Sequence, residues 1–351
     1  MRIRAITLFL GRKPQEHDEL LSAFPTEVDR AARDRKLEVW TERLALAPIS
    51  TDELHRIVDE LPKSMLVAIP AMARDQTDVR TIAEAMDGHD DLFISIWGGQ
   101  NELMLFSSLL KRAFSELGPE ACTRISFTVG KPLLTPYFPS ASARGGELGL
   151  AASLLYANDV RKALASRRAI EDRMKRCYKS AHELLRALSA RLNVQSYGVD
   201  MSLSPWMEES VARLVEKLGG CEFGGPGSHH AVHELSEALR SVASSGDVRA
   251  VGFNEVMLPY AEDSRLLELG AEGKLTAYSL LSLAPVCVAG LDMVVVPYRD
   301  EGELERFLKD AYALLHAKGR PSGIRVVLAS GEPGDVVHLK RFGRVTVMRL
   351  K

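Results

Sequence analysis

Short apolar segments alternate along the chain with longer amphipathic ones. The apolar segments are rich in Val, Ile and Phe, and several are apolar at nearly every position, which is typical of strands buried on both faces of a parallel sheet. These candidate strands are residues 3–10, 65–71, 92–97, 125–129, 194–203, 251–258, 286–296 and 324–329. The intervening segments 101–117, 208–218 and 302–315 repeat their apolar residues with the period of an α-helix.

The alternation of strand and helix predicts an α/β fold in one domain spanning residues 1–351. The number of candidate strands favours a large closed α/β barrel, with an open doubly wound sheet as the alternative. Segment 147–193 lacks Pro, lacks Gly after Gly149 and is rich in Arg. It predicts two long helices that break near residues 165–168. Its charge indicates either a solvated face or a basic rim over an anionic ligand.

Composition narrows the functional classes. The chain of 351 residues is 46% hydrophobic and 26% charged with a net charge of −2, so nothing indicates a nucleic-acid partner. No segment has the apolar length of a membrane helix, and Arg2 and Arg4 interrupt an N-terminal run too short for a signal peptide. Four widely spaced cysteines suit reduced thiols in the cytosol.

The scarcity of Asn and Gln fits a thermophile, although a GC-rich genome explains the Arg content equally well. A homodimer is expected from its general frequency.

Two loops that follow candidate strands combine Pro with aromatic or polar residues. Loop 130–140 contains three prolines, and its Tyr137 could line a pocket or pack rigidly against the barrel mouth. In segment 197–205, the period of two places Asp200, Ser202 and Ser204 on one strand face. A buried carboxylate beside hydroxyls is either a functional site or a satisfied structural network.

Two further loops combine glycine with candidate chemistry. Segment 223–228 precedes a predicted helix, so Gly227 and Ser228 could offer backbone N–H groups to an anion or form an ordinary tight turn. In segment 285–293, Cys287 is either a nucleophile or a small buried hydrophobe. Asp292 has the same two interpretations as Asp200.

Metal binding is a weaker hypothesis. His229 and His233 have helical spacing, but nothing near them completes a ligand set. The carboxylates Asp200, Glu262, Asp263 and Asp292 could converge on Mg²⁺ or Ca²⁺, and Glu262 and Asp263 could instead start a helix or act as acid or base. No nucleotide-cofactor motif is present.

Six motifs occur in the order seen in one family of uncharacterised proteins. They are SFTVGKPLLTPYFPSAS (126–142), GVDMSLSP (198–205), FGGPGS (223–228), VMLPYAED (256–263), PVCVAGLDMVVVP (285–297) and IRVVLASGEPGD (324–335). The chain resembles domain-of-unknown-function family 711, also called uncharacterised protein family 0210. The most specific motif is 287–293, similar to VCxxGLDM of that family, and Arg325 and Asp335 fall where the family has an Arg and a Gly-Asp.

The resemblance implies a large α/β barrel like that of the pyruvate formate-lyase-related glycyl radical enzymes, and no established activity. Segment 249–253 faintly resembles a glycyl-radical motif, but it lies far from the end of the chain and Cys287 follows it, which reverses the usual order. Glycyl radical chemistry is therefore not expected, and a shared fold does not transfer function. Ser228, His229, His230 and Trp206 depart from the residues usual in the family, which indicates a pocket that is either reshaped or partly lost.

These features together favour a cytosolic enzyme that acts on a small anionic metabolite at the barrel mouth, its reaction class open. Asp200 and Asp292 would serve as acid, base or orienting groups, and Cys287 as nucleophile or pocket thiol. Arg325 would bind a carboxylate or phosphate, with substrate contacts from Ser202, Tyr137, Gly227, Ser228 and Asp335. The alternatives are a non-catalytic sensor of such a metabolite, and a structural oligomer whose polar residues form buried networks.

Overall fold

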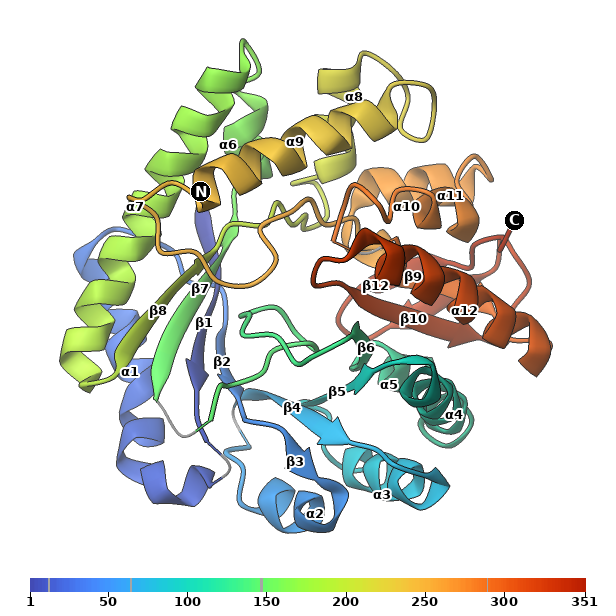
Figure 1. Ribbon diagram of the computed structural model, residues 1–351, viewed down its shortest axis with the longest axis horizontal. Coiled ribbons are helices and arrows are strands. Elements are labelled where there is room, and N and C mark those ends of the chain that lie inside the picture. Colours follow the sequence, from blue (N-terminus) through green and yellow to red (C-terminus); the bar gives the residue numbers. More distant parts are fainter. Residues whose placement is uncertain (12, 64, 146–147, 289) are drawn as a thin grey trace.

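The computed structural model describes residues 1–351 except 12, 64, 146–147 and 289. Most strands belong to one large sheet (Figure 1). Its strands are β1 (Arg2–Phe9), β2 (Glu42–Ala45), β3 (Ile49–Ser50), β4 (Leu66–Met72), β5 (Leu92–Gly98), β6 (Ile125–Val129), β7 (Gly149–Leu155), β8 (Gln195–Asp200), β9 (Asp292–Pro297) and β10 (Gly323–Ala329). The separate strands β11 (Val336–Leu339) and β12 (Gly343–Thr346) form a hairpin.

The large sheet is mostly parallel and follows the order β8-β7-β1-β2-β4-β5-β6-β10-β9, with β3 paired to β4. Strands β1, β2, β4, β5 and β6 run parallel to one another. Strand β7 is antiparallel to β1, and β10 is antiparallel to β6. The strands curve around a ring, so the fold is the predicted α/β barrel rather than the open sheet (Figure 1).

An irregular segment joins the two ends of the strand order. The backbone N–H groups of Val199 and Leu203 donate to the carbonyls of Arg249 and Glu255 at 3.0 and 3.2 Å. On its other side, the N–H of Val288 donates to the carbonyl of Val256 at 2.9 Å. The prediction of a strand over residues 251–258 is therefore wrong, because this segment makes only isolated bridges. Gly252 and Asn254 adopt left-handed backbone angles (φ +78° and +55°), which interrupt an extended strand.

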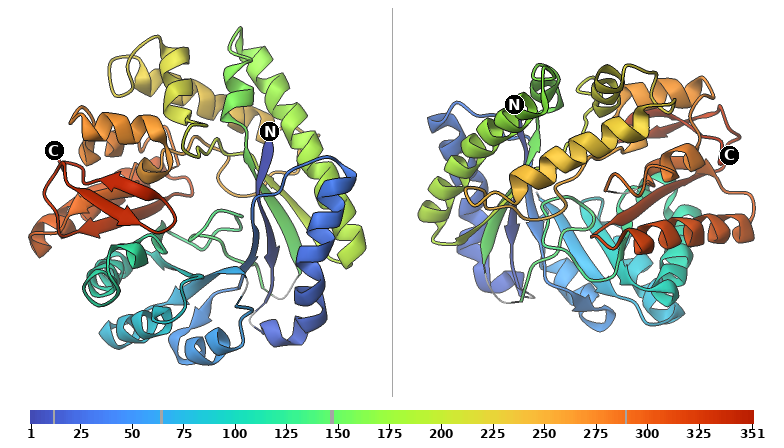
Figure 2. Two further views of the ribbon diagram at one scale, coloured as in Figure 1. Left: turned by 180° about the vertical axis from the view of Figure 1, so that it is seen from behind. Right: turned by 45° about the horizontal axis from the view of Figure 1, so that its top comes forward.

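Helices cover the outside of the ring (Figures 1 and 2). They are α1 (Asp18–Asp34), α2 (Thr51–Asp59), α3 (Gln76–Met86), α4 (Gln100–Leu117), α5 (Pro119–Cys122), α6 (Ala157–Arg161), α7 (Arg167–Leu192), α8 (Val211–Gly219), α9 (Ser228–Ala243), α10 (Ser264–Ala271), α11 (Ala277–Leu281) and α12 (Glu301–Lys318), with the 3₁₀ helices η1 (Pro14–His17) and η2 (Tyr260–Glu262). The predicted helices 101–117, 208–218 and 302–315 correspond to α4, α8 and α12, and each buries its apolar face. Among the described residues, no helix combines the length and apolar character needed to cross a membrane.

The prediction of two helices over residues 147–193 is wrong in its first half. Residues 149–155 form β7, every residue of which is buried between β1 and β8. The small and apolar residues of this strand carry no helical period, whereas α7 has a clear polar face. The predicted start at Glu147 lies outside the described residues. The strand prediction for 286–296 also needs correction, since β9 begins only at Asp292 and Ala289 is likewise outside the described residues.

Candidate functional site

A cavity of about 310 Å³ lies between the strands, the irregular segment and the β11–β12 turn. Its charged lining comes from distant parts of the chain: Arg4 from β1, Arg43 from β2, Glu262 from η2, Asp292 from β9, Arg325 from β10 and Arg341 from the hairpin turn. The aromatic lining residues are Trp40, Phe93, Tyr137, Phe138, Trp206, Phe253 and Phe342. The volume is at the lower end of the range of about 300–1,000 Å³ that is usual for ligand pockets.

Four of the charged side chains form a continuous chain of ion pairs. Glu262 accepts hydrogen bonds from Arg4 and, at 2.8 Å, from Arg325. The Arg325 Nε also donates to the Asp292 Oδ1 at 2.7 Å. Arg325 therefore holds both carboxylates: its Nε orients Asp292, and one of its terminal nitrogens neutralises Glu262.

The two carboxyl groups in this series of ion pairs, Glu262 and Asp292, have pKa values shifted in opposite directions. Burial raises the pKa of Glu262, but the charges of Arg4 and Arg325 outweigh that effect and leave the pKa below its ordinary value. Burial dominates at Asp292, with a further contribution from nearby Glu262, and raises its pKa despite the contact with Arg325. The Asp292 side chain is 21% exposed. Of the two carboxyl groups, Asp292 is therefore the one that is more readily protonated.

Arg43 lacks a charged partner among the residues that the structure describes. It is 8% exposed, its Nε donates to the Thr41 Oγ1 at 2.9 Å, and its guanidinium lies 5.1 Å from the centre of the Phe138 ring. Burial, followed by repulsion from Arg4, lowers the pKa of Arg43 to about 9. A buried cation is normally paired with an anion, so Arg43 leaves the cavity with an unneutralised positive charge.

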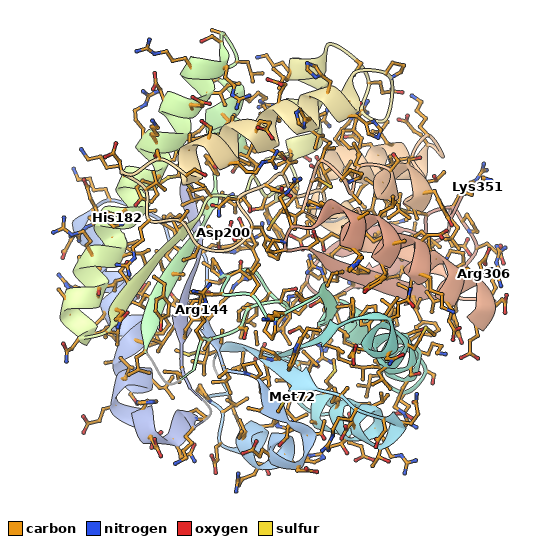
Figure 3. The ribbon with its side chains drawn as sticks, viewed as in Figure 1. Met72, Arg144, His182, Asp200, Arg306 and Lys351 are labelled. Carbon is orange, nitrogen blue, oxygen red and sulfur yellow. The ribbon has the colours of Figure 1, made fainter. Side chains whose placement is uncertain are left out.

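Asp200, by contrast, is completely buried in a satisfied hydrogen-bond network and does not line the cavity. It accepts hydrogen bonds from the Thr135 hydroxyl, from the backbone N–H and hydroxyl of Ser202, and from the N–H groups of Phe253 and Asn254. Burial raises the pKa of Asp200 in spite of these donors. A Cβ added to Gly252 would collide with the Asp200 carboxylate, which explains the glycine there. Figure 3 shows Asp200 toward the middle of the ring.

Tyr137 connects this network to the cavity. It lines the cavity, and its hydroxyl donates to the Ser202 carbonyl and to the Ser204 Oγ, both at 3.2 Å. Ser204 also lines the cavity, while the Ser202 hydroxyl is directed to Asp200. Of the three residues predicted to share one strand face, only Ser204 therefore reaches the cavity, because β8 ends at Asp200.

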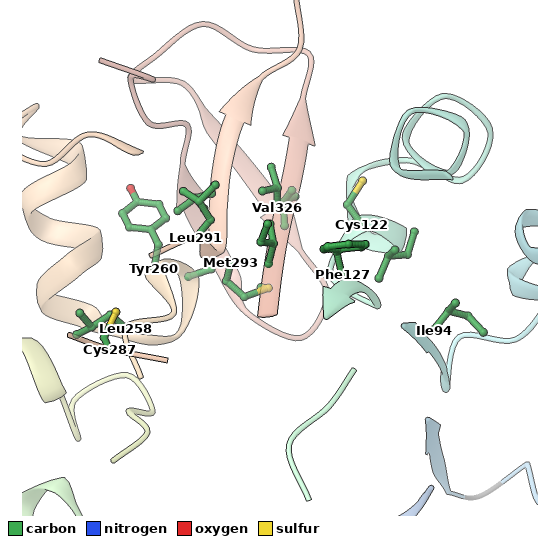
Figure 4. Packing of buried hydrophobic residues seen from close by; sticks show 14 of the residues in the cluster. Ile94, Cys122, Phe127, Leu258, Tyr260, Cys287, Leu291, Met293 and Val326 are labelled. Carbon is green, nitrogen blue, oxygen red and sulfur yellow. The ribbon is translucent and has the colours of Figure 1, made fainter. Parts of the chain in front are cut away.

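Cys287 does not line the cavity. Its side chain is completely buried in the hydrophobic cluster that also contains Leu258 and Tyr260 (Figure 4). The carbonyl oxygen of Cys287 accepts a hydrogen bond from Lys318, which also pairs with Glu255 at 2.5 Å. The expectation that this thiol faces a pocket needs correction, because only its neighbour Val288 reaches the cavity.

The remaining predicted ligand contacts lie elsewhere. The Ser228 hydroxyl accepts from the N–H of Gly224 at 3.0 Å and closes a tight turn that contains Gly227 (φ +107°). Asp335 accepts from the N–H of Glu332 at 2.8 Å in an exposed turn. Neither turn lines the cavity, and in both the side chain forms hydrogen bonds with the backbone of its own turn.

The four proposed metal ligands do not converge. Asp263 accepts hydrogen bonds from Ser210, Val211 and Ala212 and also caps α10, so it joins the starts of two helices. Within the described ranges, no group of three or more His, Cys, Asp or Glu side chains is placed to hold a metal ion. Glu262 and Asp292 meet through Arg325 instead.

Sequence reasoning missed Arg4, Arg43 and Arg341. The signal was available for the first, since Arg4 interrupts an otherwise apolar strand in which a charged residue needs a reason. Trp206, noted as a departure from the family pattern, contacts Trp40 with ring centres 4.4 Å apart. The guanidinium of Arg4 lies 5.5 and 5.7 Å from the rings of Trp40 and Trp206, so Trp206 is part of the cavity wall.

Comparison with known proteins places residues 2–340 in one family. The sequence profile described as "Uncharacterised ACR (DUF711)" matches residues 2–340. The chain belongs to this family. Its relatives include DUF711 proteins named UPF0210 from Methanopyrus kandleri (30% identity, covering 92% of this chain and 66% of the relative), Pyrobaculum aerophilum (27%, covering 99% and 90%) and Sulfurisphaera tokodaii (25%, covering 97% and 85%). The chain thus spans just under two thirds of the Methanopyrus relative.

Among solved structures, this DUF711 chain is similar to the anaerobic ribonucleotide reductase from Thermotoga maritima. The complex with dATP and CTP matches with a TM-score of 0.35 and 6% identity, covering 99% of this chain and 79% of that one. The structure with citrate in the active site matches with a TM-score of 0.34 and 5% identity, covering 94% and 81%. A likeness of this size does not bear on activity.

Proposed function

We propose that this DUF711 protein is an enzyme that acts on a small carboxylated or phosphorylated metabolite in the arginine-lined cavity. One observation carries the proposal: Arg43 is nine-tenths buried in the cavity wall and has no ion-pair partner among the described residues. An anionic ligand would supply the missing counter-charge and form charge-assisted hydrogen bonds with the guanidinium.

Asp292 is the residue that we assign to acid–base chemistry. It lines the cavity, keeps a raised pKa and is oriented by Arg325 at 2.7 Å. A carboxyl group with a raised pKa can give up or accept a proton closer to neutral pH than an ordinary one. The burial of Cys287 and Asp200 outside the cavity favours acid–base chemistry over a covalent thiol mechanism. We expect the protein to act in the cytosol and as a homodimer.

A thermal-shift screen of small carboxylates and phosphates tests the proposal. A ligand that binds the native state raises the melting temperature, and this rise should disappear in Arg43→Met. Arg80→Met removes the same charge from the exposed face of α3 and should respond like wild type. If no anion stabilises the wild-type protein, or if Arg43→Met still responds, the proposal is overturned.

A sensor without catalytic activity is the second candidate, because both cavity carboxylates are already engaged by arginines. Turnover of a ligand found in the screen separates the two. An enzyme should convert it, and Asp292→Asn should abolish conversion while retaining binding. Binding without conversion by the wild-type protein would identify the sensor instead.

A further inference from the structure

We propose that the ligand of the arginine-lined cavity is an aromatic monocarboxylate, an inference that rests on the proposed function and narrows its substrate class. Two independent features of the lining lead to it. The net charge of the lining residues determines the charge of the ligand. The arrangement of aromatic rings in the wall determines that the uncharged part of the ligand is aromatic.

The described charges around the cavity leave one positive charge over. Four arginines line it: Arg4, Arg43, Arg325 and Arg341. Three carboxylates oppose them, because Glu262 and Asp292 also line the cavity and Asp91 pairs with Arg341 at 2.6 Å. A ligand with a single negative charge neutralises the remainder, whereas a phosphate dianion would leave a buried negative charge without a partner.

The donors available to an anion are also limited. Two guanidinium nitrogens of the lining, the Arg4 Nε and one terminal nitrogen of Arg341, have no hydrogen-bond partner among the described residues, but both are buried and do not open onto the cavity. Arg43 commits only its Nε, to Thr41, among the described residues. The terminal nitrogens of one guanidinium match the two oxygens of a carboxylate, which is the pairing that arginine forms most readily.

Aromatic rings make up two clusters in the cavity wall. Trp206 contacts Trp40 and Phe342, with ring centres 4.4 and 6.0 Å apart. Phe93 and Phe138 meet edge to face at 5.4 Å, and both rings carry an arginine over their face. A planar aromatic body could stack on or meet the edges of such rings, which adds about 0.5–1.5 kcal/mol for each good ring pair.

Arg43 and Phe138 place the two features next to each other. The guanidinium lies 5.1 Å from the ring centre, so a carboxylate bound to Arg43 would hold its attached ring beside Phe138 and Phe93. An aliphatic acid such as acetate would satisfy the charge and leave the aromatic wall without a partner. The cavity volume of about 310 Å³ suits a compact ligand of this kind.

Calorimetric titration with four probes tests the proposal: benzoate, phenyl phosphate, benzamide and acetate, at neutral pH. Wild-type protein should bind benzoate at least about tenfold more tightly than each of the others, a difference equivalent to about 1.4 kcal/mol. Asp292→Asn removes one negative charge from the lining and should shift the preference toward phenyl phosphate. Arg80→Met is the matched surface control and should keep the wild-type order of affinities.

Each outcome decides a different point. Equal binding of benzoate and phenyl phosphate, or an unchanged preference in folded Asp292→Asn, would overturn the monoanion assignment and leave the proposed function intact. Acetate binding as tightly as benzoate would overturn the aromatic assignment alone. Failure of benzoate to bind, while another small anion of the thermal-shift screen does, would overturn the aromatic monocarboxylate and leave the proposed function intact, whereas failure of every anion would overturn both. Circular dichroism of each variant confirms that a lost signal does not reflect unfolding.

Discussion

Asp200 and Arg43 are both charged side chains buried by more than nine tenths, yet their surroundings are opposite. Asp200 accepts hydrogen bonds from five donors on three segments of the chain. Arg43 has one hydrogen-bond acceptor and forms no ion pair with a carboxylate among the described residues, since nearby Glu262 pairs with Arg4 and Arg325. The difference teaches that burial of a charge does not mark a ligand site by itself. A shortage of partners does, because a folded chain can satisfy its own charges and a ligand is needed only where it has not.

The largest effect is expected for Asp200→Asn. The new amide group would face several N–H and O–H donors, and one buried donor left unsatisfied costs about 1–3 kcal/mol. We expect the free energy of unfolding to fall by about 3 kcal/mol or more in chemical denaturation. Asp172→Asn, on the exposed face of α7, should cost little. A stable Asp200→Asn protein that had lost anion binding would show that Asp200 belongs to the ligand site.

Arg43→Met should change the free energy of unfolding in the opposite direction, by stabilising the protein. Removing a buried charge that lacks a partner relieves a desolvation penalty, and Met preserves most of the packing against Phe138. We expect stability to rise by about 1 kcal/mol while affinity for benzoate falls at least about tenfold. A loss of stability as large as that of Asp200→Asn would indicate that Arg43 has a structural partner.

The pH dependence of anion binding should follow the ionisation of the Arg43 guanidinium. Its pKa is lowered to about 9 in the ligand-free protein, and a bound anion stabilises the charged form and raises that pKa again. Affinity should therefore decline as the pH rises above about 9, and binding at that pH should take up protons. Titrations in buffers of different ionisation enthalpy measure this uptake. Proton release in the same range would contradict the assignment.

The smallest effect is expected at the turn before α9. Ser228→Ala removes the hydroxyl that accepts from Gly224 and should cost about 1 kcal/mol. Because Ser228 does not line the cavity, the affinity for benzoate should stay at the wild-type value. A clear loss of affinity with unchanged stability would show that the Gly227–Ser228 turn contacts the anion after all.

The fold was largely predictable from the sequence because its strands and helices differ strongly in period. The apolar runs of β1, β4, β5, β6 and β10 were placed within about two residues, the error usual for element ends. The sequence does not reveal strand β7, because its seven small and apolar residues, which begin with Gly149, carry no decisive period. The joining segment was mistaken for a strand because its composition is apolar, while Gly252 and Asn254 decide its backbone.

The site was less predictable because its contacts join residues far apart in the chain. Local patterns suggest Asp292 and Tyr137, the family resemblance suggests Arg325, and the structure brings these three to one cavity. Nothing local reveals that Glu262 lies between Arg4 and Arg325, or that Arg43 has been left without a carboxylate. Asp200 and Cys287 looked reactive by residue type, and only their surroundings show that one is satisfied and the other enclosed in the core. Charged residues inside apolar strands, such as Arg4, are the local signal most worth following.

A crystal structure of the protein soaked with 4-bromobenzoate tests most directly whether Arg43 awaits an anion. We expect the anomalous signal of bromine inside the arginine-lined cavity, with the carboxylate of the probe in hydrogen-bond contact with the Arg43 guanidinium. Bromine found only on the outer surface, with Arg43 paired to a carboxylate of the protein itself, would contradict the central claim.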